Sequence, residues 1–282
     1  MTAFIKWFGL CLALASLTAQ SNDINQSITQ GVRSADSEQG GFLDVGLGIG
    51  IYRNPIYGYP EGNRAGNLLT QTGAYLNING RYQYKDFFVE AFSESVSGFN
   101  LGYRLLNDES WAAEAILSPI FGYLGKDDSD DWQNLREREG DFAAGVRLSY
   151  YRNANIFQVR LLSDISGQHY GESASLFVGR SWQKRNWNYH ALLGATYTSA
   201  AVYNHFLGVS EQEAANNSDL TAYQAGAGVD FTFEIGVAYP ISEDWVFRSN
   251  YRYLSLADAV ADSPLTVRDD AHILLTSLSY VF

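Results

Sequence analysis

The stretch that most resembles catalytic chemistry is "DISGQHYG", residues 164–171, in which Asp164, Ser166 and His169 lie close together in the sequence. A serine, a histidine and an aspartate are the residue types of an acyl-transfer triad. Such a triad is defined by geometry and not by closeness in sequence. Aspartate, serine and glycine also favour turns. We therefore predict a turn here and assign no catalytic residue, and a lipid-modifying membrane enzyme remains the less favoured alternative.

Metal and cofactor chemistry have weaker support in the sequence. The run "KDDSDD", residues 126–131, is acidic enough to hold a divalent cation, but the remainder of an EF-hand loop is missing. His190, His205 and His272 are scattered without metal-ligand spacing. No glycine-rich phosphate motif follows a strand and opens a helix. The sequence therefore predicts neither a metal site nor a cofactor site.

Composition limits the class of partner. The 282 residues carry a formal net charge of −12 at pH 7, so the basic footprint of a nucleic-acid-binding protein is absent. The single cysteine, Cys11, lies near the N-terminus, so a disulfide framework is not expected. We predict no nucleic-acid partner.

The N-terminus reads as a targeting segment. Lys6 is followed by an apolar run and then by small residues before Gln20, a pattern typical of a secretory signal peptide. The apolar run is too short to span a bilayer as a helix. We predict a signal peptide over residues 1–19, a flexible periplasmic leader over 20–41, and a single folded unit over 42–282.

From Phe42 onward, the apolar residues repeat with a period of two, which predicts strands. About twelve segments have this pattern, and most have the ~9–11 residues that a tilted transmembrane strand needs. We therefore predict an all-β fold, a transmembrane antiparallel up-and-down β-barrel that ends in a closing strand with a C-terminal phenylalanine. The segments are 42–52, 73–84, 86–94, 98–106, 111–121, 141–151, 155–165, 171–182, 187–198, 228–239, 244–256 and 271–282.

The connections between these segments differ in length in a regular way. Connections after even-numbered strands are tight, whereas four after odd-numbered strands are long: 53–72, 122–140, 201–224 and 257–269. The connections near Ser95 and Gln168 are short exceptions. Outer-membrane barrels have short periplasmic turns and longer outer loops. This asymmetry predicts a multi-pass barrel in the outer membrane of a Gram-negative cell, with both termini in the periplasm.

The closing strand presents Leu278, Tyr280 and Phe282 on one face. We predict that this face contacts lipid and that the terminal phenylalanine serves as an assembly signal for the barrel-assembly machinery. Aromatic residues also cluster near the ends of other strands, which is typical of the girdles of membrane barrels. Outer-membrane lipids are thus expected partners.

Acidic and basic residues on the opposite, inward faces are predicted to pair across neighbouring strands, because buried charges are rarely left unpaired. A turn around Ile241 would place Glu234 opposite Arg248. The same register would place Asp230 opposite Arg252. Other predicted members of this lumen charge network are Arg81, Glu90, Arg104 and Glu114, with turns around Ser97 and Glu109 placing Arg104 opposite both glutamates.

The network has two interpretations. A charge-lined lumen could form a selective pore. Matched opposite charges could equally form a plug that closes a narrow barrel, and the matching favours the plug. Arg147, Gln158, Arg160 and Asp164 extend the polar face without evident partners.

Three stretches carry a family resemblance. They are "HFLGVSEQEAANNSDLTAYQAGAG" (205–228), "YPISEDWVFRSNYRYLSLADAVADSPLTVRDD" (239–270) and "DISGQHYGESASLFVG" (164–179). Together with the phenylalanine ending, they resemble the MipA/OmpV family of outer-membrane proteins. The resemblance is strongest after Asp164 and looser in the first hundred residues.

The resemblance implies a non-enzymatic outer-membrane barrel. The family takes its name from a member described as a scaffold that links a murein hydrolase to a murein synthase. The favoured hypothesis is therefore a scaffold or interaction protein of the cell envelope, with periplasmic enzymes of peptidoglycan metabolism as its partners. A porin-like channel or an adhesin, which other members are described as, is the main alternative.

Overall fold

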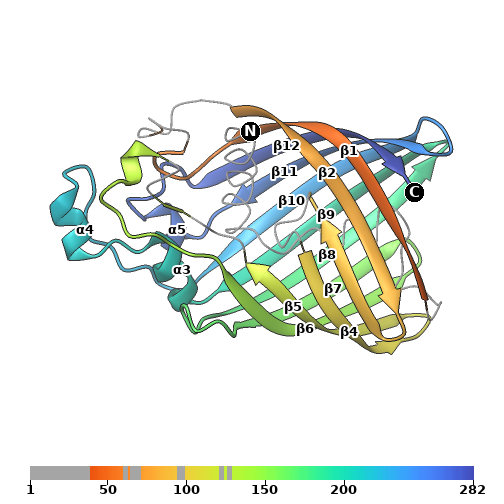
Figure 1. The fold of residues 1–282 in the computed structure, drawn as a ribbon, viewed down its shortest axis with the longest axis horizontal. Helices are drawn as coiled ribbons and strands as arrows, with labels where there is room; N and C mark the ends of the chain where they lie inside the picture. The colour runs from red at the N-terminus through yellow and green to blue at the C-terminus, as the bar shows by residue number, and fades with distance from the viewer. Residues whose placement is uncertain (1–38, 60–62, 64–70, 94–98, 121–123, 126–128) are drawn as a thin grey trace.

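The computed structural model describes residues 39–59, 63, 71–93, 99–120, 124–125 and 129–282. These residues form a closed barrel of twelve antiparallel strands, each paired with its neighbours in sequence (Figure 1). The strands are β1 (Gln39–Arg53), β2 (Gln71–Tyr84), β3 (Phe87–Phe92), β4 (Phe99–Asn107), β5 (Trp111–Ile120), β6 (Asp141–Arg152), β7 (Asn155–Asp164), β8 (Glu172–Lys184), β9 (Trp187–Thr198), β10 (Gly228–Pro240), β11 (Trp245–Ser255) and β12 (Asp270–Val281). The predicted fold class is confirmed.

Pairing of the first and last strands closes the barrel. Val45 lies opposite Tyr280, and the backbone N–H of Phe282 donates to the Leu43 carbonyl at 2.9 Å. Closure leaves no unpaired sheet edge, which is a requirement for a sheet within lipid. Strand β1 begins at Gln39, inside the predicted leader. The predicted signal peptide and the rest of the leader lie outside the described residues.

The two ends of the barrel differ, as Figure 1 shows. Tight connections join β2–β3, β4–β5, β6–β7, β8–β9 and β10–β11 at one end, which we call the turn end. The long connections meet at the other end, the loop end. They contain the short helices η1 (Asp130–Trp132), α3 (Ala200–Leu207), α4 (Glu211–Asn216) and α5 (Asp258–Ala261). Among the described residues, no helix is long and apolar enough to cross a membrane.

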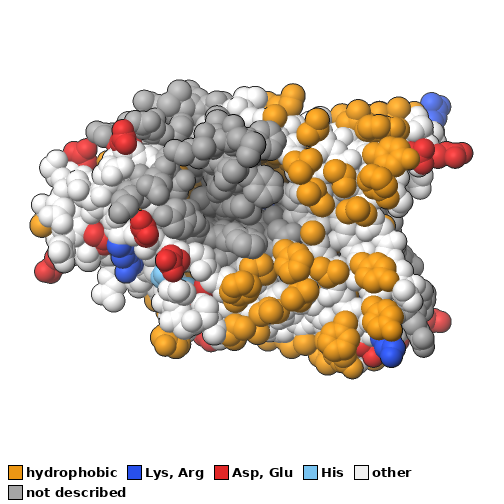
Figure 2. All heavy atoms as spheres, in the orientation of Figure 1, with side chains coloured by type: hydrophobic (Ala, Val, Ile, Leu, Met, Phe, Trp, Pro, Cys, Tyr) orange, Lys and Arg blue, Asp and Glu red, His pale blue; other side chains and the backbone are white. Residues whose placement is uncertain are grey.

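Alternation along the strands separates two surfaces of the wall. On β8, Leu176, Val178 and Trp182 are exposed, whereas Phe177 is buried. On the face seen in Figure 2, hydrophobic side chains cover the barrel wall, and charged side chains gather toward the two ends. The outer wall therefore matches a hydrocarbon layer, while the inward face holds most of the polar residues of the strands.

Candidate functional site

A four-residue ion cluster lies inside the barrel near β2 to β6; we call it the first charge cluster. Arg81 donates to Glu90 at 2.9 Å and to Glu114 at 2.6 Å. Arg147 donates to the same two carboxylates at 2.8 and 2.6 Å. Asn100 adds a hydrogen bond to Glu90 at 3.1 Å. Two arginines thus neutralise two buried glutamates, which is the condition under which buried charges are tolerated.

A second charge cluster lies on β9 to β11. The Arg252 Nε donates to Glu234 at 2.6 Å, and the other Glu234 oxygen lies 3.1 Å from the His190 Nε2. Nearby, Arg248 donates to both oxygens of Asp44 on β1 at 3.2 and 3.1 Å. The Arg248–Asp44 pair joins strands from both ends of the sequence around the closure of the barrel.

The predicted pairing of charges between β10 and β11 is wrong, because the register of the two strands differs from the predicted one. The ladder places Glu234 opposite Arg252, and it places Arg248 opposite Ala238. Pro240 still pairs with Val246, so the turn lies over residues 241–244 and is not centred on Ile241. Asp230 has no arginine opposite it. It accepts hydrogen bonds from the Tyr203 hydroxyl at 2.6 Å and from the Ala257 backbone at 2.9 Å.

The prediction for Arg104 is partly wrong. Glu90 lies opposite Asn100, because the β3–β4 hairpin is centred two residues earlier than expected. Arg104 does lie opposite Glu114. The Arg104 guanidinium nevertheless approaches Asp86 at 3.4 Å, close to the register shift between Arg104 and Leu106. Glu114 forms its salt bridges with Arg81 and Arg147.

Side chains fill the interior between these clusters. The inward residues Asn77, Asn79, Glu90, Arg160, His190, Glu234 and Ser279 are each at most 2% exposed. Asn77 donates to Ser279 at 2.9 Å, and Asn79 donates to Asp44 at 3.2 Å. A continuous water channel would leave such side chains exposed. The barrel interior is therefore a packed polar core at the level of these residues.

The long connections form a second core at the loop end, which we call the outer cap. Its apolar centre includes Trp132, Tyr59, Leu207, Val260 and Leu265, all at most 2% exposed. The Trp132 ring meets Tyr59 edge-on at 5.6 Å, and its indole N–H donates to the Tyr57 carbonyl at 2.8 Å. Four loops far apart in sequence thus bury one another above the strands.

One glutamate joins two loops of the outer cap. Glu213 forms a capping box with Ser210 at the start of α4 and accepts from the Arg136 backbone N–H at 2.9 Å and from Arg138 at 3.2 Å. Burial alone would raise the pKa of Glu213, but hydrogen bonds from Ser210 and Arg136 and the charge of Arg138 lower it overall. Burial also lowers the pKa of Arg138 to about 10, so its guanidinium stays charged at neutral pH.

The residues that suggested a triad form a turn instead. The Asp164 carboxylate accepts from the Ser166 hydroxyl at 2.7 Å and from the backbone N–H groups of Ser166, His169 and Tyr170. The serine hydroxyl therefore points to the aspartate and not to the histidine. This is the geometry of a hydrogen-bonded loop and not of an activated nucleophile.

Asp141, Asp164 and His169 bring possible metal-ligand atoms within 4.8 Å of one another. The His169 Nδ1 accepts the Gly171 backbone N–H at 2.9 Å, so the ring proton resides on Nε2. Nε2 faces Asp141 in close contact. A metal at Nε2 would need the opposite tautomer. The arrangement thus serves best as a polar link between β6 and the β7–β8 loop.

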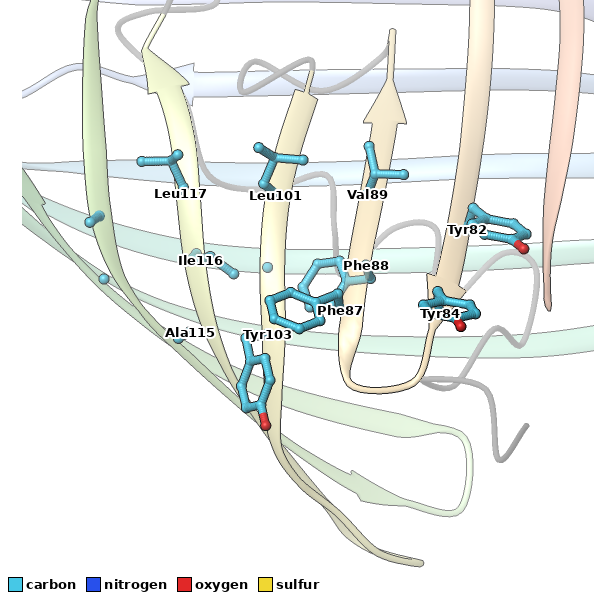
Figure 3. A pocket seen from close by; sticks show the side chains of 13 residues that line it. Tyr82, Tyr84, Phe87, Phe88, Val89, Leu101, Tyr103, Ala115, Ile116 and Leu117 are labelled. Atoms are coloured by element: carbon cyan, nitrogen blue, oxygen red, sulfur yellow. The ribbon is translucent and has the colours of Figure 1, made fainter. Parts of the chain in front are cut away.

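The outer wall carries an apolar hollow of about 620 Å³ over β2 to β6 (Figure 3). Its rim near the turn end is aromatic, with Phe87 and Tyr103 in edge-on contact at 4.9 Å. On β11 and β12, Tyr280 contacts both Trp245 and Phe282, and Phe282 is 74% exposed. Leu278 is also exposed on this outward face. These rings occupy the level expected of an interfacial girdle.

An apolar outer wall, aromatic rims and a polar packed interior define the class: this is a barrel protein of the outer membrane. The family model for MltA-interacting protein MipA matches residues 45–282. The chain therefore belongs to the MipA family, as the resemblance implied.

Named relatives agree with this assignment. The MltA-interacting protein of Escherichia coli (strain K12) is 23% identical over 249 residues, covering 86% of this chain and 91% of the relative. Outer membrane protein OmpV of Vibrio cholerae is 29% identical over 91 residues, covering 32% and 34%. Among solved structures, the NanC porin superposes with a TM-score of 0.41 at 11% identity over 84% of this chain and 98% of that one.

Two site residues were missed as partners by sequence reasoning. Arg147 bridges both glutamates of the first charge cluster, and Asp44 holds Arg248. The sequence could have indicated Arg147, because Glu114 and Arg147 both fall on the inward face of two consecutive strands, where they lie opposite each other. Asp44 could not be matched, because its contact with Arg248 depends on how the barrel closes.

Proposed function

We propose that this protein is a non-enzymatic scaffold of the outer membrane that binds enzymes of murein synthesis and hydrolysis on its periplasmic side. The observation that carries this proposal is the packed interior, which leaves surfaces, and not a lumen, to perform the function. The name of the Escherichia coli relative, MltA-interacting protein, supports a murein enzyme as partner. We take the turn end as periplasmic, because the long loops of such barrels face outward.

The test is site-specific photocrosslinking in cells. A photoreactive residue would replace Asn186 in the β8–β9 turn or Ser242 in the β10–β11 turn, both exposed at the turn end. A matched position at the loop end is Gln212 on α4, which is also exposed. We expect murein enzymes to be recovered from the turn positions and not from Gln212. Recovery of none from either turn would refute the scaffold.

The absence of catalysis is part of the proposal and has its own test. Ser166 and His169 would be the residues of a lipid-modifying enzyme. We expect cells that carry Ser166→Ala to have the same outer-membrane lipid profile as the wild type and as a deletion strain. A lipid species that disappears both in the deletion strain and in Ser166→Ala would reverse this conclusion.

A further inference from the structure

The turn end of the barrel is divided into charged sectors. Two neighbouring hairpins, β6–β7 and β8–β9, carry four exposed cations that we call the basic sector: Arg152, Arg180, Lys184 and Arg185. The hairpins on either side carry acids at their turns, Asp108 and Glu109 before β5 and Glu243 and Asp244 before β11. Opposite charges are thus sorted into separate arcs of one rim.

Within the part of the chain that the structure describes, the basic sector has no acidic partners. Among the described residues, no ion pair or hydrogen bond joins the side chains of Arg152, Arg180, Lys184 or Arg185 to a carboxylate. In contrast, the inward arginines Arg81, Arg147, Arg248 and Arg252 are each matched to buried acids. In a chain of net charge −12, four neighbouring cations that contact no described carboxylate form a local field of the opposite sign.

The placement of Arg180 indicates what kind of partner fits. It shares the outward face of β8 with Val178 and Trp182, which are 39% and 47% exposed. Trp182 stacks on Tyr189 of β9 at 6.2 Å, marking the aromatic girdle. Arg180 lies two residues deeper along the strand, roughly 6.6 Å toward the middle of the wall. An outward arginine at this depth is costly unless an anion meets it.

We propose that the basic sector binds the phosphate headgroups of anionic phospholipids in the periplasmic leaflet. Arg152 ends β6 and faces outward like Arg180, while Lys184 and Arg185 extend the positive surface into the turn. A guanidinium matches a phosphate in shape and charge. A lipid phosphate reaches the level of the girdle, and the apolar wall above it accepts the acyl chains. A soluble periplasmic protein would reach Lys184 and Arg185 but not Arg180.

The experiment measures lipid choice directly. The mature barrel in detergent is mixed with equal amounts of phosphatidylglycerol and phosphatidylethanolamine that carry the same acyl chains. Native mass spectrometry then reports the ratio of the two lipids retained. We expect the wild type to prefer phosphatidylglycerol, and Arg152→Gln with Arg180→Gln to lower this preference by roughly fivefold for each cation removed.

Lys85→Gln is the matched control. Lys85 is an exposed cation at the same end, but it lies beside Asp86 and outside the basic sector. We expect Lys85→Gln to retain the wild-type preference. If Arg180→Gln fails to fold, Lys184→Gln with Arg185→Gln tests the same sector from the turn, and Arg180→Lys should keep the preference.

Three results would overturn the inference. One is a wild type without preference for the anionic lipid. Another is a loss of lipid preference in Lys85→Gln equal to that in the basic-sector variants, which would mean that total charge, and not the basic sector, determines the lipid preference. The third is an Arg152→Gln with Arg180→Gln variant that keeps the wild-type preference. Crosslinks from position 186 that vanish in Lys184→Gln with Arg185→Gln would then assign the sector to a protein. The lipid inference does not depend on the scaffold proposal, because the purified barrel alone is measured.

Discussion

At the scale of single residues, the buried ion clusters carry large individual effects on stability. Arg147 reaches Glu90 and Glu114 with two of its nitrogens at 2.6–2.8 Å. Removing it leaves two buried carboxylates with one arginine. Breaking a buried charge group by deleting one partner costs far more than the intact group contributes, because a charge is left uncompensated.

We predict that Arg147→Met destabilises the folded barrel by about 3–5 kcal/mol. Equilibrium unfolding in urea, followed by tryptophan fluorescence, measures the change. Lys85→Met is the control, because this cation is exposed at the turn end, and its replacement should change stability by less than about 0.5 kcal/mol. Equal effects of the two substitutions would show that the first charge cluster does not contribute as its geometry indicates.

A second prediction at this scale separates loop structure from catalysis. Asp164 accepts hydrogen bonds from several donors of its own loop, whereas the Ser166 hydroxyl only adds one of them. Asp164→Ala should therefore leave several N–H groups without acceptors and destabilise the loop by about 1–3 kcal/mol. Ser166→Ala should cost less than about 1 kcal/mol. Hydrogen exchange of residues 165–171 measures both, and a larger effect of Ser166→Ala would contradict the assignment.

At the scale of elements, the strands were predictable and their partners less so. Alternation such as that of Leu47 and Ile49 against small residues reports which residues face outward, so the twelve strands follow from the sequence. Register depends on where each turn lies, and a shift of two residues keeps every side chain on its own face. Alternation therefore could not reveal that Glu234 lies opposite Arg252.

The outer cap was beyond sequence reasoning for a related reason. Its core joins residues such as Trp132, Leu207 and Val260, which come from separate loops. The sequences of these loops have no hydrophobic periodicity. Long loops were predicted at this end, but no pattern in them reports which loops pack together. The "GVS" stretch does contain a visible capping signal, Ser210 followed by Glu213. The additional contacts of Glu213 with Arg136 and Arg138 come only from the tertiary structure.

We predict that Glu213→Gln loosens the outer cap at neutral pH by about 2 kcal/mol, because hydrogen bonds to a charged group are among the stronger ones. The folded pKa of Glu213 is lowered, so its contribution is present above the ordinary glutamate pKa of about 4.3 and is lost as pH falls through the lowered value. Hydrogen exchange in residues 199–227, recorded at pH 7 and at acidic pH, measures the stability of the outer cap.

The control for this prediction is Glu211→Gln, on the same helix but exposed. It should leave exchange unchanged at both pH values. The wild type and Glu213→Gln should converge in acid, because protonation of Glu213 removes the same charge as the substitution. A difference between them that persists well below pH 4 would contradict a role for the ionised carboxylate.

At the scale of the whole molecule, two barriers lie in series along the barrel axis. The outer cap closes the loop end with an apolar core, and polar side chains fill the interior below it. A buried polar core tolerates charges that are paired, and the arginines of the two clusters are each paired with a carboxylate. Among the described residues, the interior is thus filled at two levels, and the apolar wall and the rims are the surfaces available for contact.

The two barriers lead to a conductance prediction in planar bilayers. We expect the wild type to pass no steady current.

The variants separate the two barriers. Trp132→Ala loosens the outer cap, with a cavity cost of about 3–5 kcal/mol, yet it should remain silent because the interior is still filled. Adding Glu234→Ala with Arg252→Ala removes an acid and its basic partner, two long inward side chains, and should produce steady openings. Adding Ser277→Ala with Ser279→Ala to Trp132→Ala, which removes only small inward side chains, should remain silent. Current in the wild type would restore the pore interpretation, and current in Trp132→Ala alone would place the whole barrier in the cap.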